Sequence, residues 1–117
     1  NNDVRYIIYY NLAVSYYYID HLEMTLEYLD NAKEIKDTEE LHFLRAETYS
    51  KNDIEKAIAE YKILIRLNAD NSDYVIRLAN IYIKNHDYLN ARKIVKAYLK
   101  KHPNDKEKFS TYGVLLF

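Results

Sequence analysis

The sequence contains no cysteine and no tryptophan, and it has only one glycine and one proline in 117 residues. Without cysteine there can be no disulfide scaffold, thiolate zinc site or cysteine nucleophile, and the absence is compatible with a reducing compartment such as the cytoplasm. Tight β-turns and phosphate-binding loops need glycine and proline. Their scarcity therefore predicts an all-helical chain. No apolar run reaches about 18 residues, so no membrane span is expected.

What the sequence does contain is enough to build a core. Its residues are 49% hydrophobic and 30% charged, a balance typical of one folded domain of this length. The chain begins with Asn rather than Met and shows no charged-then-apolar leader, so we expect no signal peptide. This start is compatible with a piece of a longer protein.

Charge is nearly balanced overall but unevenly placed. The net charge is −1, which gives no electrostatic footprint for nucleic acid, and we expect no nucleic-acid partner. Residues 1–60 carry 6 Lys and Arg against 13 Asp and Glu, whereas residues 77–117 carry 9 against 3. The sequence therefore predicts an acidic amino-terminal part and a basic carboxy-terminal part.

A pattern about 33 residues long recurs along the chain. An Ala followed three residues later by a Tyr occurs as Ala13–Tyr16, Ala46–Tyr49 and Ala79–Tyr82. A small residue followed four residues later by a large one occurs as Thr25–Leu29, Ala57–Tyr61 and Ala91–Val95. Two helices within such a period are typical of a solenoid of helical hairpins. The small residues allow the two helices of a hairpin to approach closely.

This series resembles the tetratricopeptide repeat (TPR) family, with about three repeats and the first helix of a fourth. The third repeat matches best, through Leu78, Ala79, Tyr82, Ala91, Val95, Tyr98 and Pro103. The resemblance implies an all-α, right-handed superhelical solenoid of antiparallel hairpins with about seven helices. It covers residues 1–117 as one domain, with repeats at about 5–38, 39–71 and 72–105 and a partial repeat or capping helix at 106–117.

Apolar periodicity and cap residues predict where the helices begin and end. Asp20, Asp53 and Asp87 stand where helix N-caps are expected. In the second repeat either Leu44 aligns with Leu78 or Ala46 with Ala79, and we favour the alanine register. The expected helices are 3–18, 21–36, 39–51, 54–67, 72–85, 88–101 and 105–117.

The sequence offers no constellation for catalysis. The four histidines, at positions 21, 42, 86 and 102, show no spacing typical of metal ligands. Carboxylates at Glu23, Glu27, Asp30 and Glu34 follow one helical stripe, which is usually a solvated face. We therefore expect no enzyme, no cofactor and no metal.

The resemblance implies that the first helix of each hairpin lines a concave binding surface. The partner-binding residues implied by register are Tyr10, Val14, Tyr17, Tyr18, Phe43, Glu47, Arg77, Asn80 and Lys84. Some members of the family hold a terminal carboxylate with a clamp of Lys, Asn and Arg. Here Tyr10, Val14, Leu44 and Asp73 replace clamp residues and only Arg77 remains, so that function is not expected.

Two functions stay open at this point. The first is a protein- or peptide-binding module, because aromatic and Arg residues suit an interface. The second is a structural segment of a longer repeat array or a self-assembling scaffold, in which the tyrosines of the first helix pack on a further repeat. Self-association through the terminal helices would use the apolar residues near the carboxy terminus, which are Phe109, Tyr112, Leu115 and Leu116.

Overall fold

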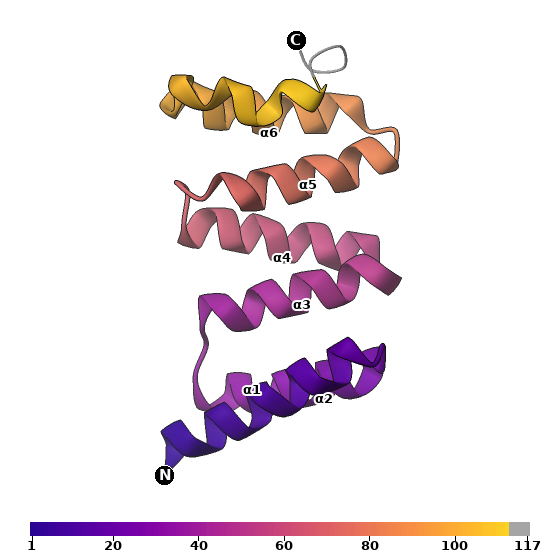
Figure 1. The fold of residues 1–117 in the computed structure, drawn as a ribbon, viewed down its shortest axis with the longest axis vertical. Coiled ribbons are helices and arrows are strands. Elements are labelled where there is room, and N and C mark those ends of the chain that lie inside the picture. Colours follow the sequence, from indigo (N-terminus) through magenta and orange to yellow (C-terminus); the bar gives the residue numbers. More distant parts are fainter. Residues whose placement is uncertain (113–117) are drawn as a thin grey trace. The chain divides into compact units, whose positions relative to one another are not determined.

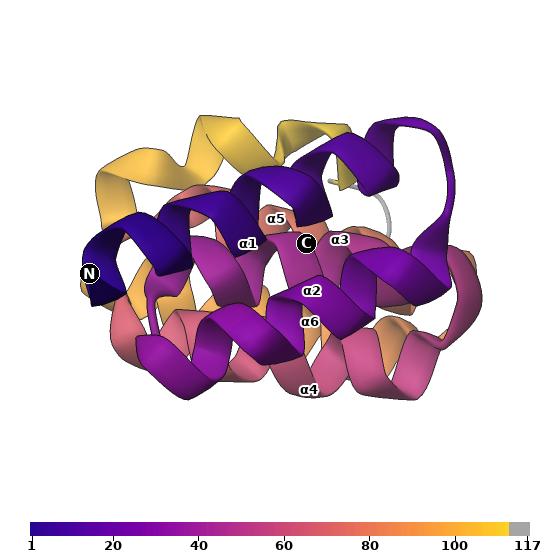
Figure 2. The same cartoon turned by 90° about the horizontal axis from the view of Figure 1, so that it is seen from below.

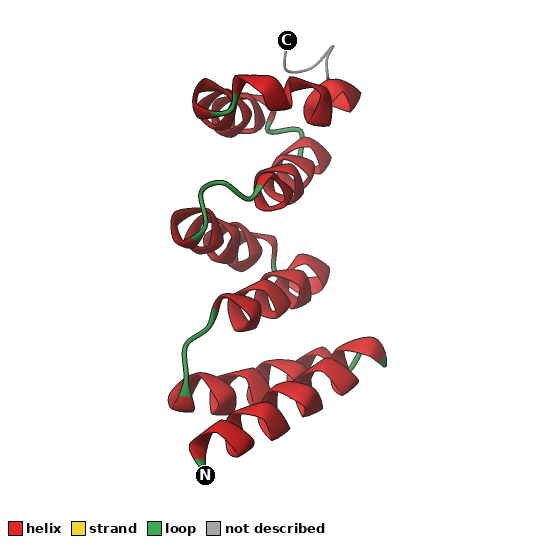
Figure 3. Cartoon of the chain, turned by 60° about the vertical axis from the view of Figure 1, so that its left-hand side comes forward, coloured by secondary structure: helices red, strands yellow, loops and turns green. Residues whose placement is uncertain are grey.

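The computed structural model describes residues 1–112, with side chains as far as Ser110. Every regular element in this range is a helix, as Figure 3 shows by colour. The elements are α1 (Asn2–Tyr18), α2 (Leu22–Ile35), α3 (Glu39–Asn52), α4 (Ile54–Leu67), α5 (Ser72–Lys84), α6 (Tyr88–Lys101) and the 3₁₀ helix η1 (Pro103–Tyr112). The prediction of an all-α fold built from successive helical hairpins is confirmed, and the bounds of the six α-helices agree with the expected ones to within one residue.

Most helices begin at a side chain that caps the first turn. The backbone N–H of Lys56 donates to Asp53 Oδ1 at 3.2 Å, and that of Asn90 donates to Asp87 Oδ1 at 3.2 Å, so two expected caps are confirmed. The expectation for Asp20 is wrong. His21 Nδ1 accepts from Met24 N instead, because Asp20 adopts a left-handed backbone with φ of 60°.

Contacts divide the chain into two compact units, Asn1–Glu60 and Tyr61–Phe117, with the boundary inside α4. In the first unit α1 and α2 form an antiparallel hairpin, whose connecting turn lies at the right of Figure 2. The small residues predicted at the close contact, Ala13 and Thr25, are both fully buried. The Thr25 hydroxyl donates to the His21 carbonyl at 3.0 Å, so threonine replaces alanine here without leaving its polar group unpaired.

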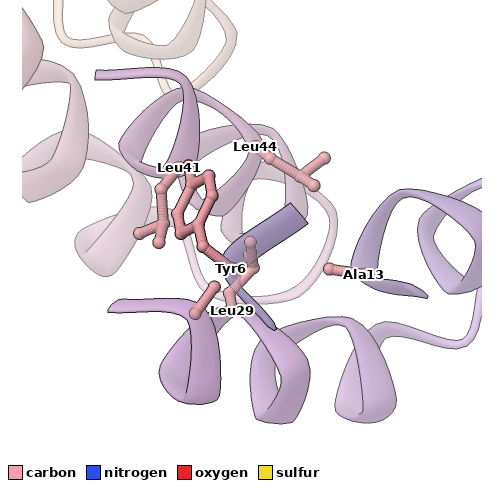
Figure 4. Packing of buried hydrophobic residues seen from close by; sticks show 6 residues of the cluster. Tyr6, Ala13, Leu29, Leu41 and Leu44 are labelled. Carbon is pink, nitrogen blue, oxygen red and sulfur yellow. The ribbon is translucent and has the colours of Figure 1, made fainter. Parts of the chain in front are cut away.

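The core of the first unit joins three helices. Figure 4 shows Tyr6 of α1 beside Leu41 of α3, with Leu29 of α2 close by. Leu29 and Leu41 are fully buried, and Ala46 is as well, which supports the alanine register for α3. Leu44 lies in the same core cluster, so it is not available as a binding residue.

The core of the second unit lies between α5 and α6 and includes the end of α4. Ala79 and Ala91 are fully buried at the hairpin contact, as their counterparts are in the first unit. The 3₁₀ helix η1 packs on α6 (Figure 1), where Phe109 is fully buried and its ring lies 5.7 Å from that of Tyr98.

The seventh helix differs from the expected one in type and start. We expected an α-helix over 105–117, but the described part is a 3₁₀ helix that begins at Pro103, where a missing N–H costs nothing. The backbone N–H of Asp105 donates to the His102 carbonyl at 3.1 Å. The expectation that Phe109 belongs to an uncovered apolar surface is wrong, because its side chain is fully buried, and the side chains of Tyr112, Leu115 and Leu116 lie outside the described residues. Within the range that the structure describes, no helix is both long and apolar enough to cross a membrane.

Candidate interaction surface

Within the first unit, six of the predicted partner-binding residues lie on α1 and α3. We call them the tyrosine surface; they are Tyr10, Val14, Tyr17 and Tyr18 on α1, and Phe43 and Glu47 on α3. Val14 lies four residues after Tyr10, and Tyr17 and Tyr18 lie three and four residues after Val14, so the four side chains share one broad helical face. Tyr18 is 78% exposed, and the other five are half-buried. Large aromatic area is therefore partly open to solvent on this unit.

One end of the tyrosine surface is fixed by Tyr6. The Tyr6 hydroxyl lies 2.6 Å from Thr38 Oγ1 and donates to Glu40 Oε1 at 2.9 Å. Thr38 also caps α3, because its hydroxyl oxygen accepts from the Leu41 N–H. Burial of this phenol, reinforced by the Glu40 carboxylate, raises the pKa of Tyr6 to about 12. The Tyr6 and Tyr10 rings are stacked at 6.0 Å, so the same contact supports Tyr10.

The other end is fixed by Lys51. Its ammonium lies 2.7 Å from Asp20 Oδ1 and 4.2 Å from the centroid of the Tyr17 ring. The bond to Asp20 raises the pKa of Lys51. A cation over a tyrosine face is attracted by the ring quadrupole. The face of Tyr17 is thus partly covered, while the neighbouring Tyr18 ring meets it edge-on at 5.5 Å.

These two contacts share a spacing that reveals how α1 and α3 are aligned. Tyr6 and Glu40 are 34 residues apart, and so are Tyr17 and Lys51. The first turns of α1 therefore contact the first turn of α3, and the last turn of α1 contacts the last turn of α3. The two helices run parallel, about one repeat apart in sequence. Neither pair was predicted from the sequence, although complementary residues about one repeat length apart were the signal available.

The three predicted residues of the second unit lie on α5. Arg77 is half-buried and its Nε donates to Asp73 Oδ2 at 2.9 Å, while Asn80 and Lys84 are exposed. The Arg77–Asp73 pair spans one helical turn. An incoming acidic group would therefore compete with Asp73 for this guanidinium.

A second face of α1 is apolar and uncovered. Val4, Ile8 and Leu12 repeat every four residues and are 52%, 51% and 36% exposed. On α3, the position equivalent to Ile8 at the 33-residue spacing of Ala13 and Ala46 is Leu41, which is fully buried in the core that α3 shares with α1 and α2. This face of α1 therefore has the character of a helix-packing surface.

Buried polar residues of the first unit form a network rather than a metal site. His42 Nδ1 lies 2.7 Å from Glu60 Oε2 and its Nε2 lies 2.6 Å from Asp37 Oδ1. Arg45 contacts Asp30 and lies 3.7 Å from Glu60 Oε1. Among the residues that the structure covers, no group of three or more acidic or histidine side chains is arranged to hold a metal ion.

The comparison with known families agrees with this architecture. The sequence model described as Tetratricopeptide repeat matches residues 48–110, which is more than half of the chain. The chain therefore belongs to the tetratricopeptide repeat family, whose members are generally modules for protein–protein interaction. No curated protein matches the sequence.

Proposed function

We propose that this chain is a non-catalytic protein-binding module, and that its tyrosine surface receives a peptide or helix of a partner protein. The observation that carries the proposal is the row of α1 side chains Tyr10, Val14, Tyr17 and Tyr18. The Tyr18 side chain at its end is 78% exposed. Tyrosine suits such a surface because it buries a large rigid ring at low entropic cost and keeps a polar tip.

The support of this row strengthens the proposal. Tyr10 is held by the Tyr6 ring and Tyr17 by the Lys51 ammonium, so their rotamers are restricted before a partner arrives. A surface that is ordered in advance loses less conformational entropy on binding. On the second unit, we propose that the separate polar patch of Arg77, Asn80 and Lys84 receives an acidic group of the partner.

A quantitative capture experiment tests the proposal. The tagged full chain, the Tyr18→Ala variant and the Tyr88→Ala variant are compared by mass spectrometry of the proteins that they retain from source cells. Tyr88 is a partly exposed tyrosine of the second unit and serves as the matched control. We expect one partner to be lost from Tyr18→Ala and kept by Tyr88→Ala. Equal capture by all three chains would reject the tyrosine surface.

The second candidate function is a structural segment of a longer array, and the uncovered face of α1 favours it. Val4, Ile8 and Leu12 would then pack on another hairpin or on another copy. We expect a concentration-dependent mass in solution in that case, and Ile8→Lys should abolish it. If the chain is a monomer at all concentrations, the result would favour a protein-binding module that acts alone over a structural segment.

A further inference from the structure

The second unit contains an open cavity of about 410 Å³ between α4, α5 and α6. Its lining includes Lys62, Ile65 and Arg66 of α4, Ala69 in the turn that follows α4, and α6 residues from Ile94 to Lys101 spaced by three, four and seven. Each set therefore lies on one helical face. Cavities of about 300–1,000 Å³ are typical of small-molecule sites.

The base of the cavity is apolar and well held. Val75 and Leu78 of α5 are almost completely buried, while the wall residues Ala69 and Ala97 are small and exposed. Tyr98 also lines the cavity, and its hydroxyl donates to the carboxylate of Asp105 in η1, which is not a lining residue. The cavity thus has a fixed apolar interior.

The mouth of the cavity is cationic. Lys62, Arg66 and Lys101 are exposed lining residues, and no Asp or Glu lines the cavity with them. None of the three has an ion-pair partner among residues 1–110. The neighbouring acid, Asp70, has its carboxylate 3.0 Å from His102 Nε2. Three positive charges around an apolar base therefore stand without an anion.

In the first unit, the residues that correspond to the base of this cavity are polar and are paired with acidic groups of the same chain. His42 and Arg45 of α3 precede Val75 and Leu78 by 33 residues, one repeat. There the polar side chains of α3 meet acidic groups from α2, α4 and the loop before α3. In the second unit the same positions are apolar and the cations are at the mouth, so no internal group supplies the negative charge.

We propose that this cavity binds a small anionic amphiphile, a carboxylate with a medium-length apolar chain. The apolar chain occupies the space over Val75 and Leu78, and the carboxylate contacts Lys62, Arg66 and Lys101. Charge complementarity selects the head group, and burial of apolar area supplies most of the affinity. This site uses none of the residues of the tyrosine surface, so it goes beyond the proposed protein-binding function.

Nuclear magnetic resonance of the ¹⁵N-labelled full chain tests the proposal. Decanoate, neutral decanamide and cationic decyltrimethylammonium are titrated separately, each below its micelle concentration. We expect decanoate to shift amide resonances within 62–69, 75–78 and 94–101, and to bind about tenfold more tightly than the cationic probe. Equal affinity for the three probes, or shifts elsewhere in the chain, would overturn it.

Two variants and one control locate the site. Ala97→Phe fills the cavity from its exposed wall and should abolish the decanoate shifts. A triple variant with Gln at Lys62, Arg66 and Lys101 should lower the affinity for decanoate by about tenfold. The control places Gln at Lys93, Lys96 and Lys100 of α6, which removes the same charge outside the cavity. An equal loss in the control, or shifts of these resonances by an acidic peptide but not by decanoate, would reject the proposal.

Discussion

The Lys51 ammonium lies 4.2 Å from the centroid of the Tyr17 ring, while its Nζ also bonds Asp20 Oδ1 at 2.7 Å. One side chain of α3 thereby contacts both the end of α1 and the turn that follows it. Together with the contact of Tyr6 to Thr38, it fixes the first helix of one hairpin against the first helix of the next.

We expect Lys51→Gln to lower Tm, because the variant loses both the cation over Tyr17 and the ion pair with Asp20. The difference from the parent chain should shrink in high salt, since the pair is exposed and salt screens it. Lys33→Gln is the matched control, an exposed lysine of α2 in the same unit. Thermal unfolding by circular dichroism measures the effect; an equal change in both variants would reject a specific role for Lys51.

Because the pKa of the Tyr6 hydroxyl is raised, we expect the free energy of unfolding to fall at alkaline pH. Its pKa is about 12 in the folded chain and about 10 when unfolded, so the folded state holds its proton more tightly. The contribution of protonated Tyr6 to the free energy of unfolding is complete below pH 10 and declines as the pH rises toward 12. We expect Tyr6→Phe to show a smaller decline over this interval in denaturant titrations. The absorbance titration at 295 nm should also lose one phenol that ionises late, and an unchanged titration would contradict the assignment to Tyr6.

The close contact of the α5–α6 hairpin predicts a cost for larger side chains. Ala79 is fully buried, so Ala79→Leu should lower the free energy of unfolding by roughly 1–3 kcal/mol. That is a large share of a typical stability of about 5–15 kcal/mol. Ala59→Leu, at an exposed position of α4, should leave the urea midpoint nearly unchanged. If both variants unfold at the parent midpoint, the alanine register of α5 is wrong.

Removal of the buried acid Glu60 of the first unit should also lower stability. Glu60→Ala leaves His42 and Arg45 without their shared carboxylate, and we expect a loss of about 3 kcal/mol, as for other broken buried pairs. Glu27→Ala, an exposed acid of α2, should change the free energy of unfolding by less than about 0.5 kcal/mol. A double-mutant cycle with His42→Ala measures the coupling, and additive effects would show that the pair is not coupled.

The helices were predictable because they depend on local patterns. The spacing of Ala13, Ala46 and Ala79 identified the hairpin contact, and all three are fully buried. The cap at Asp20 was predicted wrongly: His21 caps α2 after a left-handed Asp20, and the Asp20 carboxylate bonds Lys51, 31 residues away. Such competition between a local and a distant partner cannot be read from the order of residues alone.

The candidate sites depended more on tertiary packing. The aromatic row of α1 was implied by the register of the family resemblance, but the cover of Tyr17 by Lys51 required the parallel alignment of α1 with α3. The cavity was not predicted at all. It arises from space left over Val75 and Leu78 between helices, and such space depends on the volumes of side chains that are distant in sequence.

The uneven distribution of charge coincides with the division into units. Residues 1–60 contain 6 basic and 13 acidic side chains, and residues 61–117 contain 11 basic and 5 acidic ones. Copies that associate would gain most when the acidic unit of one meets the basic unit of the next, which is a heterologous, head-to-tail contact. Repeated contacts of this kind give an assembly a direction, whereas a two-fold symmetric dimer has none and pairs unlike charges only when its two copies lie antiparallel.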